Sequence, residues 1–287
     1  MQSGTLLWND GGSMPKVEKP TPNFIYGTAW KENSTAELTQ KAVRAGFRAI
    51  DTANQPRHYQ EALVGQALEE LASEGISRDS LYVQTKFTPL NGHDHRVPYE
   101  PDADLHTQVR QSFASSLKNL KTDSVDSYLL HGPYSYPGLT DADWAVWGAI
   151  EEIYRAGGAR AIGVSNVNAL QLAAFVQDAA VKPMVVQNRC YARMGWDRDV
   201  REICRRIGIM YQGFSLLTAN PAVLSSPKVG AIAVRLGVQP EQVVFRFALQ
   251  IGIIPLTGTT DERHMKDDLQ ALEIELSDEE LEFLGAG

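Results

Sequence analysis

Eight short apolar segments alternate with longer segments of helical periodicity, and this alternation constrains the fold more than any other feature of the sequence. Strands that alternate with helices pair in parallel through right-handed crossovers. Eight such units without a break in composition predict one closed (β/α)8 TIM barrel of the α/β class, forming a single domain over residues 1–287. The predicted strands cover residues 24–29, 47–51, 81–87, 125–131, 159–165, 183–188, 208–214 and 252–258.

The alternative fold is an open, doubly wound sheet. Its phosphate-binding loop would follow the first strand, but "YGTAW" lacks the GxGxxG spacing, which favours the barrel. The first long helix is expected to begin at the N-cap Ser34 and to end at Gly46, and a second helical pattern covers residues 104–120. The Asp-Gly pair in "LLWNDGGSMP" predicts an N-terminal β-hairpin that plugs the N-terminal mouth of the barrel.

Composition excludes several classes of partner. Thirty-five acidic residues against 27 basic residues give a formal charge of −8, which argues against binding to nucleic acid or to an anionic membrane surface. The two cysteines form no CxxC motif or Cys/His cluster, so no metal site is expected. No run of about 18 apolar residues and no secretion signal is visible, and we expect a cytoplasmic protein.

Polar residues gather at the predicted ends of the strands. Each has an ordinary structural explanation when taken alone: an aspartate caps a helix, a lysine lies on a solvated rim, and a histidine packs with one hydrogen bond. Barrel enzymes, however, carry their chemistry on the face where the carboxyl ends of the strands meet. Convergence on that face therefore predicts an active site, built from Asp51, Lys86, His131, Ser165, Asn166, Gln187 and Phe214.

Over nearly its whole length the sequence resembles the aldo-keto reductase family. The segments that carry the resemblance are "NDGGSMP", "YGTAW", "AGFRAIDTA" with a following tyrosine and "EALVG", "YVQTK", "DSYLLHGP", "RAIGVSN", "VVQN", "FSLL" and "PLTGTT". The resemblance implies an NAD(P)H-dependent enzyme that reduces aldehydes or ketones to alcohols. It also implies a catalytic tetrad of Asp51, Tyr59, Lys86 and His131.

The same resemblance implies where a nicotinamide cofactor binds. Ser165, Asn166 and Gln187 would hold the carboxamide, and Phe214 would stack on the nicotinamide ring. The other implied cofactor residues are Gly27, Thr28, Ser215, Leu217, Thr257, Thr259, Arg263 and Asp267. The resemblance implies NADP(H) as the cofactor. Leu256 stands where many relatives have a lysine for the 2′-phosphate, which weakens the case for strict NADPH use and leaves NAD(H) as the alternative cofactor.

Hydride transfer to a carbonyl builds negative charge on oxygen, which an acid must neutralise. A tyrosine with a pKa of about 10 is a weak acid, and a neighbouring Lys86 ammonium would favour its phenolate. Asp51 would keep that buried ammonium charged, and His131 would orient the carbonyl.

The position of the acid departs from the family pattern. Counting back from Glu61 puts His58 where the tyrosine usually stands, because "NQPRH" separates Ala53 from Tyr59. Either the loop bulges and Tyr59 reaches the site, or His58 occupies it with altered chemistry. Loop insertions are readily absorbed at the active face of a barrel, which favours Tyr59.

Several aromatic residues are predicted to lie above the barrel and to wall a pocket for a small-molecule carbonyl substrate: Trp30, Phe87, Tyr99, Tyr134 and Tyr136, together with His58. The alternative is that two or three of them only pack the loops. A second alternative concerns the whole chain, which would bind the cofactor as a regulatory or sensor subunit with little turnover. We expect a monomer or a weak homo-oligomer.

Overall fold

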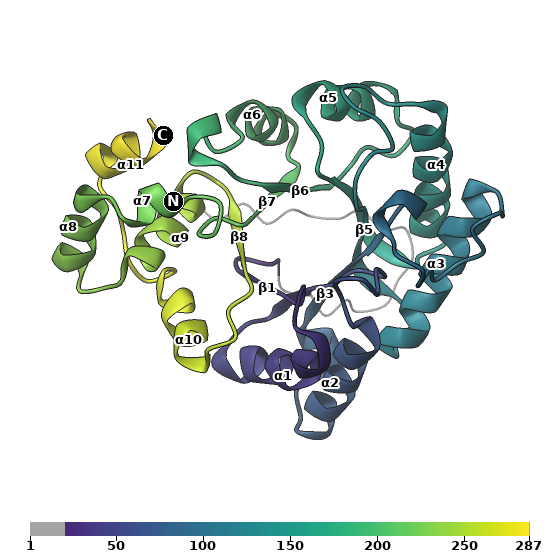
Figure 1. Ribbon diagram of the computed structural model, residues 1–287, viewed down its shortest axis with the longest axis horizontal. Coiled ribbons are helices and arrows are strands. Elements are labelled where there is room, and N and C mark those ends of the chain that lie inside the picture. Colours follow the sequence, from purple (N-terminus) through teal and green to yellow (C-terminus); the bar gives the residue numbers. More distant parts are fainter. Residues whose placement is uncertain (1–20, 287) are drawn as a thin grey trace, which may run out of the picture.

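The structure, a computed structural model, describes residues 21–286, and the hairpin predicted within residues 1–20 lies outside them. Eight parallel strands close into a barrel in sequence order. Figure 1 looks into this ring of strands. They are β1 (Ile25–Gly27), β2 (Ala49–Asp51), β3 (Tyr82–Phe87), β4 (Val125–Leu130), β5 (Ala159–Ser165), β6 (Val185–Arg189), β7 (Met210–Phe214) and β8 (Ile254–Thr257). The predicted barrel is confirmed, and each predicted strand overlaps an observed one.

Helices surround the barrel on its outside (Figure 1). The α-helices are α1 (Thr35–Ala45), α2 (Glu61–Ser73), α3 (Leu105–Leu120), α4 (Asp141–Arg155), α5 (Ala169–Asp178), α6 (Arg198–Ile207), α7 (Pro221–Leu224), α8 (Pro227–Leu236), α9 (Pro240–Gln250), α10 (Glu262–Gln270) and α11 (Asp278–Gly285). Short 3-10 helices are η1 (Glu32–Ser34), η2 (Arg78–Ser80), η3 (Leu90–Gly92) and η4 (Ala192–Met194).

The ends of α1 show one expected and one corrected cap. Gly46 ends the helix with φ of 126°, a value that residues with a Cβ rarely adopt. Ser34 holds the N-cap position, but its side chain makes no capping hydrogen bond because the chain enters the helix through η1. The Thr35 hydroxyl instead donates to the Glu32 carbonyl, 2.7 Å away.

Apolar side chains form separate groups inside and outside the barrel. The large core lies between strands and helices, where Trp147 of α4 packs on Phe175 of α5 with ring centroids 5.1 Å apart. Smaller clusters are formed by strand residues alone, such as Ile25 with Ala49 and Tyr82. Above these clusters, towards the carboxyl ends of the strands, the barrel interior becomes polar, and this change positions the site.

Candidate active site

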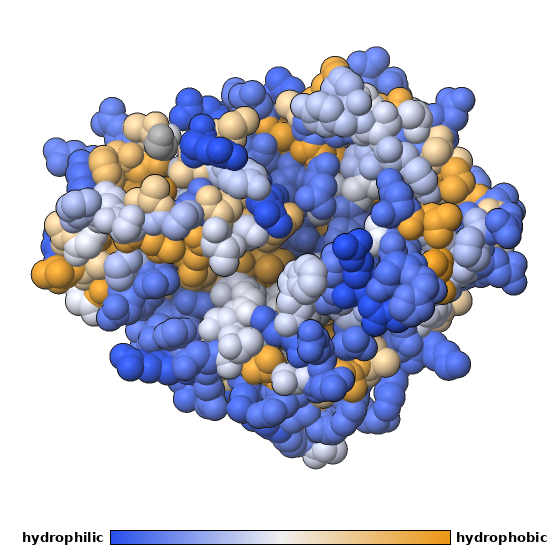
Figure 2. Space-filling view, viewed as in Figure 1, coloured by the Kyte–Doolittle hydropathy of each residue, from blue (hydrophilic) through white to orange (hydrophobic). Residues whose placement is uncertain are grey.

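A cavity of about 1110 Å³ opens at the carboxyl ends of the strands. Figure 2 shows a hollow near the centre of this face, with hydrophilic side chains around it. Strand-end residues that line the cavity are Gly27, Asp51, Ser165, Gln187, Arg189, Phe214 and Thr257, and His131 directly follows β4. The volume is at the upper end of the range for small-molecule and cofactor pockets.

Asp51 and Lys86 form a buried ion pair at the floor of the cavity. The Lys86 Nζ lies 2.7 Å from each carboxylate oxygen of Asp51 and 2.9 Å from the Thr52 carbonyl oxygen, so all three ammonium protons have acceptors. Burial lowers the pKa of Lys86, and the adjacent Asp51 carboxylate opposes that shift. The carboxylate thereby keeps the ammonium charged inside the barrel.

Tyr59 lies between this ion pair and His131. Its ring centroid is 5.4 Å from the Lys86 Nζ and 6.0 Å from the centroid of the His131 ring. Burial, and then the Asp51 charge, raise the pKa of Tyr59 well above its usual value. The expectation that Lys86 lowers this pKa is therefore not met in the free protein, because the ammonium donates to Asp51 and Thr52 instead of to the phenol.

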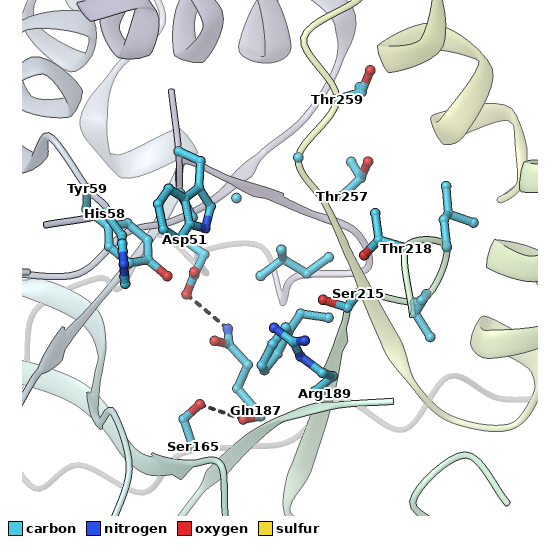
Figure 3. A pocket seen from close by; sticks show the side chains of 18 of the residues that line it. Asp51, His58, Tyr59, Ser165, Gln187, Arg189, Ser215, Thr218, Thr257 and Thr259 are labelled. Atoms are coloured by element: carbon cyan, nitrogen blue, oxygen red, sulfur yellow. Dashed lines mark hydrogen bonds between the residues drawn. The ribbon is translucent and has the colours of Figure 1, made fainter. Parts of the chain in front are cut away.

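The residues between Ala53 and Tyr59 form a tight turn that brings Tyr59 to this position. The backbone N–H groups of His58 and Tyr59 both donate to the Gln55 carbonyl, each at 3.0 Å, and Pro56 directly follows the acceptor residue. His58 lies on the rim, where its ring stacks on Trp30 with centroids 3.9 Å apart and its Nδ1 is 2.9 Å from Gln55 Oε1. Figure 3 shows His58 and Tyr59 side by side on the wall nearest Asp51.

His131 faces the cavity as a neutral ring. Burial, reinforced by the Lys86 charge, lowers the pKa of His131 well below its usual value. Its Nδ1 lies 2.7 Å from the Thr88 hydroxyl oxygen. Thr88, which follows β3, was not anticipated as a site residue, although it stands two positions after Lys86 and so follows the inward-facing alternation of that strand.

The predicted carboxamide residues all line the cavity, and Figure 3 shows two of them, Ser165 and Gln187, next to each other. The Ser165 hydroxyl donates to the backbone carbonyl oxygen of Gln187 at 2.6 Å, and the Asn166 side chain donates to the backbone carbonyl oxygen of His131 at 2.8 Å. Next to them, the Arg189 guanidinium lies over the Phe214 ring, 5.4 Å from its centroid. Arg189 was also missed in the sequence, and it has no ion-pair partner among residues 21–286.

The far end of the cavity is bounded by β8 and α10. Arg263, which is 82% exposed, pairs with Asp267 at 3.7 Å. Asp268 is buried, accepts a hydrogen bond of 2.8 Å from the Thr257 hydroxyl, and has a pKa raised to about 6 by burial. The Lys31 ammonium donates to the Gly258 carbonyl oxygen and so connects the loops that follow β1 and β8.

The cavity lining includes every predicted cofactor residue except Thr28, which is fully buried with its hydroxyl on the Asp51 carbonyl oxygen. The predicted aromatic wall needs a larger correction, because only Trp30 and His58 line the cavity. Phe87 follows the inward-facing Lys86 and therefore points outward, where it packs on Tyr99 in the core. Neither Tyr134, which packs against the core, nor the exposed Tyr136 belongs to the lining.

Within residues 21–286, no three His, Cys, Asp or Glu side chains come together as metal ligands. In the same part of the chain, no helix is both long and apolar enough to cross a membrane. The cysteines Cys190 and Cys204 are buried and unpaired.

A parallel barrel with a buried Asp–Lys pair, a tyrosine and a neutral histidine at its carboxyl face defines an oxidoreductase type of site. The Aldo/keto reductase family model matches residues 23–285, and the chain belongs to this family. Curated relatives include glyoxal reductase of Bacillus subtilis, 29% identical over 88% of this chain and 83% of that protein. Deoxymugineic acid synthase 1-D of Triticum aestivum is 31% identical over 94% of this chain and 88% of the synthase.

Solved structures support the same fold. MGS-M4, an aldo-keto reductase enzyme from a Medee basin deep-sea metagenome library, superposes with a TM-score of 0.77 at 23% identity, covering 91% of this chain and 89% of its own. Gox0644 at apoform superposes with a TM-score of 0.76 at 24% sequence identity, covering 92% of this chain and 88% of the Gox0644 chain. The family match and the curated relatives together identify the chain as an enzyme that reduces carbonyl groups with NAD(P)H.

Proposed function

We propose that Tyr59 is the proton donor in this carbonyl reduction. The observation that carries the proposal is the position of Tyr59 beside both the Lys86–Asp51 pair and the neutral His131. The raised pKa keeps the phenol protonated in the free enzyme, so it is ready to donate. As negative charge grows on the substrate oxygen, the nearby ammonium stabilises the phenolate that forms.

We infer that His131 orients the carbonyl. If the Thr88 hydroxyl donates to Nδ1, the ring proton resides on Nε2 and can be donated to a substrate oxygen. Burial first, and then the Lys86 charge, lower the pKa of His131, so the ring is neutral and adds no second positive charge beside Lys86. Thr88 is then a positioning residue that fixes the tautomer.

A nicotinamide cofactor fits the residues that line the cavity. The Gln187 side-chain oxygen has no hydrogen-bond partner within residues 21–286, and it can accept from a carboxamide N–H, while Phe214 offers a ring face for stacking. When bound, the reduced cofactor supplies the hydride. Ser165 and Asn166 complete the contact set that we propose for the carboxamide.

We propose NADP(H) as the preferred cofactor, with a modest margin over NAD(H). Arg263 is the exposed guanidinium at the far end of the cavity, and a guanidinium can bind a 2′-phosphate bidentately. The margin is modest because Leu256 adds no charge there and because Glu241, Asp267 and Asp268 also line this end. Their carboxylates disfavour an additional phosphate.

The proposed substrates are small aldehydes and activated ketones, including aromatic ones. Trp30 is 70% exposed and stacks with His58 at the mouth of the cavity, where together they offer an apolar surface beside Tyr59. A related protein is named glyoxal reductase, in keeping with a small dicarbonyl substrate. We further infer a cytoplasmic location, from the two unpaired cysteines, and a monomer or weak homo-oligomer.

The test is NADPH consumption by the purified protein with and without a small aromatic aldehyde, in the presence and absence of a chelator. Consumption should require the aldehyde and should be unaffected by the chelator. Tight NADPH binding without aldehyde-dependent consumption would contradict the proposal and favour a cofactor sensor.

A further inference from the structure

Two glutamines join opposite walls of the barrel beneath the cavity. Gln84 of β3 and Gln212 of β7 are both completely buried and exchange two hydrogen bonds. The Gln84 amide nitrogen donates to Gln212 Oε1 at 2.8 Å, and the Gln212 amide nitrogen donates to Gln84 Oε1 at 3.0 Å. Neither side chain lines the cavity.

This amide pair contacts two residues of the site directly. The Gln84 nitrogen also donates to Asp51 Oδ1 at 2.7 Å. The Gln187 nitrogen donates both to Asp51 Oδ1, at 3.0 Å, and to Gln212 Oε1, at 2.9 Å. Four side chains from β2, β3, β6 and β7 therefore form one buried network, and Figure 3 shows its upper link from Asp51 to Gln187.

The hydrogen-bonding capacity of the groups fixes the direction of every amide. A carboxylate only accepts, so Asp51 requires the nitrogen ends of Gln84 and Gln187. The side-chain oxygen of Gln84 can only accept, so it needs a hydrogen bond from the Gln212 nitrogen. The Gln212 oxygen then faces Gln187 and accepts from the Gln187 nitrogen. With both of its N–H groups occupied below, Gln187 has only its oxygen left for a ligand in the cavity.

We propose that Gln84 and Gln212 are positioning residues. They hold the Gln187 side chain with its amide oxygen directed at the carboxamide of the nicotinamide. This inference rests on the proposed cofactor site. It assigns a role in ligand recognition to two residues that touch neither cofactor nor substrate.

The surroundings argue against a purely structural role. Elsewhere in the barrel, strand residues such as Leu129, Ala161 and Val185 form an apolar cluster. Burying amides where aliphatic side chains would pack is unfavourable unless each polar group finds a partner. The network meets that requirement with bonds that run to Gln187 and Asp51, the residues that face the cavity.

The experiment compares the dissociation constants of NADPH and of its 3-acetylpyridine analogue, in which a methyl group replaces the carboxamide nitrogen. The analogue cannot donate to Gln187, so the wild type should bind NADPH about two- to tenfold more tightly. Gln187→Leu should lose this preference. Gln212→Met and the double variant Gln84→Met/Gln212→Met should lose most of it, while the matched control Gln108→Met, a buried glutamine of α3, should keep it.

Thermal unfolding separates positioning from stability. Gln212→Met leaves the Gln84 side-chain oxygen and one Gln187 N–H without their partner and should lower the midpoint by a few degrees, whereas the double variant, which removes the unpaired Gln84 oxygen, should regain part of that loss. The preference for the carboxamide should not return in the double variant. A preference that survives in both Gln212→Met and the double variant, or a wild type that does not discriminate, would overturn the positioning role. A wild type that binds neither dinucleotide would refute the proposed function instead.

Discussion

Replacing Lys86 by methionine tests the buried ion pair on which the site is built. The substitution keeps the length of the side chain but removes three hydrogen bonds, and it leaves Asp51 Oδ2 without a donor among residues 21–286. Asp51 Oδ1 still accepts from Gln84 and Gln187. Breaking one half of a buried pair costs roughly 3–5 kcal/mol. We therefore expect a fall in the thermal midpoint on the order of 10 °C.

The activity of the same variant should fall by on the order of a hundredfold or more in kcat, the scale of a positioned acid–base contribution. The double variant Asp51→Asn/Lys86→Met removes both charges and should recover much of the stability but none of the activity. Lys41→Met is the control, because Lys41 pairs with Glu37 on an exposed face of α1 and its loss should change little. A Lys86→Met enzyme as stable and active as the wild type would refute the reasoning.

Three further predictions concern pH and cofactor. Because the pKa of His131 lies well below 6.5 and that of Tyr59 well above 10, kcat/KM should be flat from about pH 7 to pH 9, and a limb centred near 6.5 would contradict the neutral histidine. Because the pKa of Asp268 is raised to about 6, the protonated carboxyl stabilises the fold fully below about pH 4, and this stabilisation is lost as pH rises through about 6. Between pH 4 and pH 7.5 the wild type should therefore lose roughly 2–3 kcal/mol in its free energy of unfolding relative to Asp268→Asn, as measured by urea unfolding at each pH. Arg263→Ala should weaken the binding of NADPH but not that of NADH. Equal NADPH dissociation constants for the wild type and Arg263→Ala would remove Arg263 from the site.

The fold could be predicted because its signal is local and repeated. Each strand ends in a turn or loop before the next helical segment, so the alternation alone gave all eight strands. The ends of β2 and β3 then gave Asp51 and Lys86, since the carboxyl ends of barrel strands converge. The same reasoning, applied strictly with period two from Lys86, would have placed Gln84 and Thr88 inward and Phe87 outward.

Other features depend on contacts between distant strands. The Gln84–Gln212 pair joins β3 to β7, and no local pattern indicates that these two amides meet across the barrel. Tyr99 looked like a pocket residue because it falls in a long loop, but that loop folds back and its hydroxyl donates to the Thr88 carbonyl oxygen. The direction of the Tyr59 pKa shift likewise could not be predicted from the sequence, because it depends on which groups accept the Lys86 protons.

We propose that Tyr59, and not His58, donates the proton. The most direct measurement is single-turnover reduction of an aromatic aldehyde by Tyr59→Phe and His58→Ala, with the NADPH dissociation constant measured for each. Tyr59→Phe keeps the ring and removes the proton, so its rate should fall by roughly two to four orders of magnitude with NADPH binding nearly unchanged. His58→Ala should retain the rate and mainly raise KM, because His58 lies on the rim against Trp30. An active Tyr59→Phe beside an inactive His58→Ala would contradict the account.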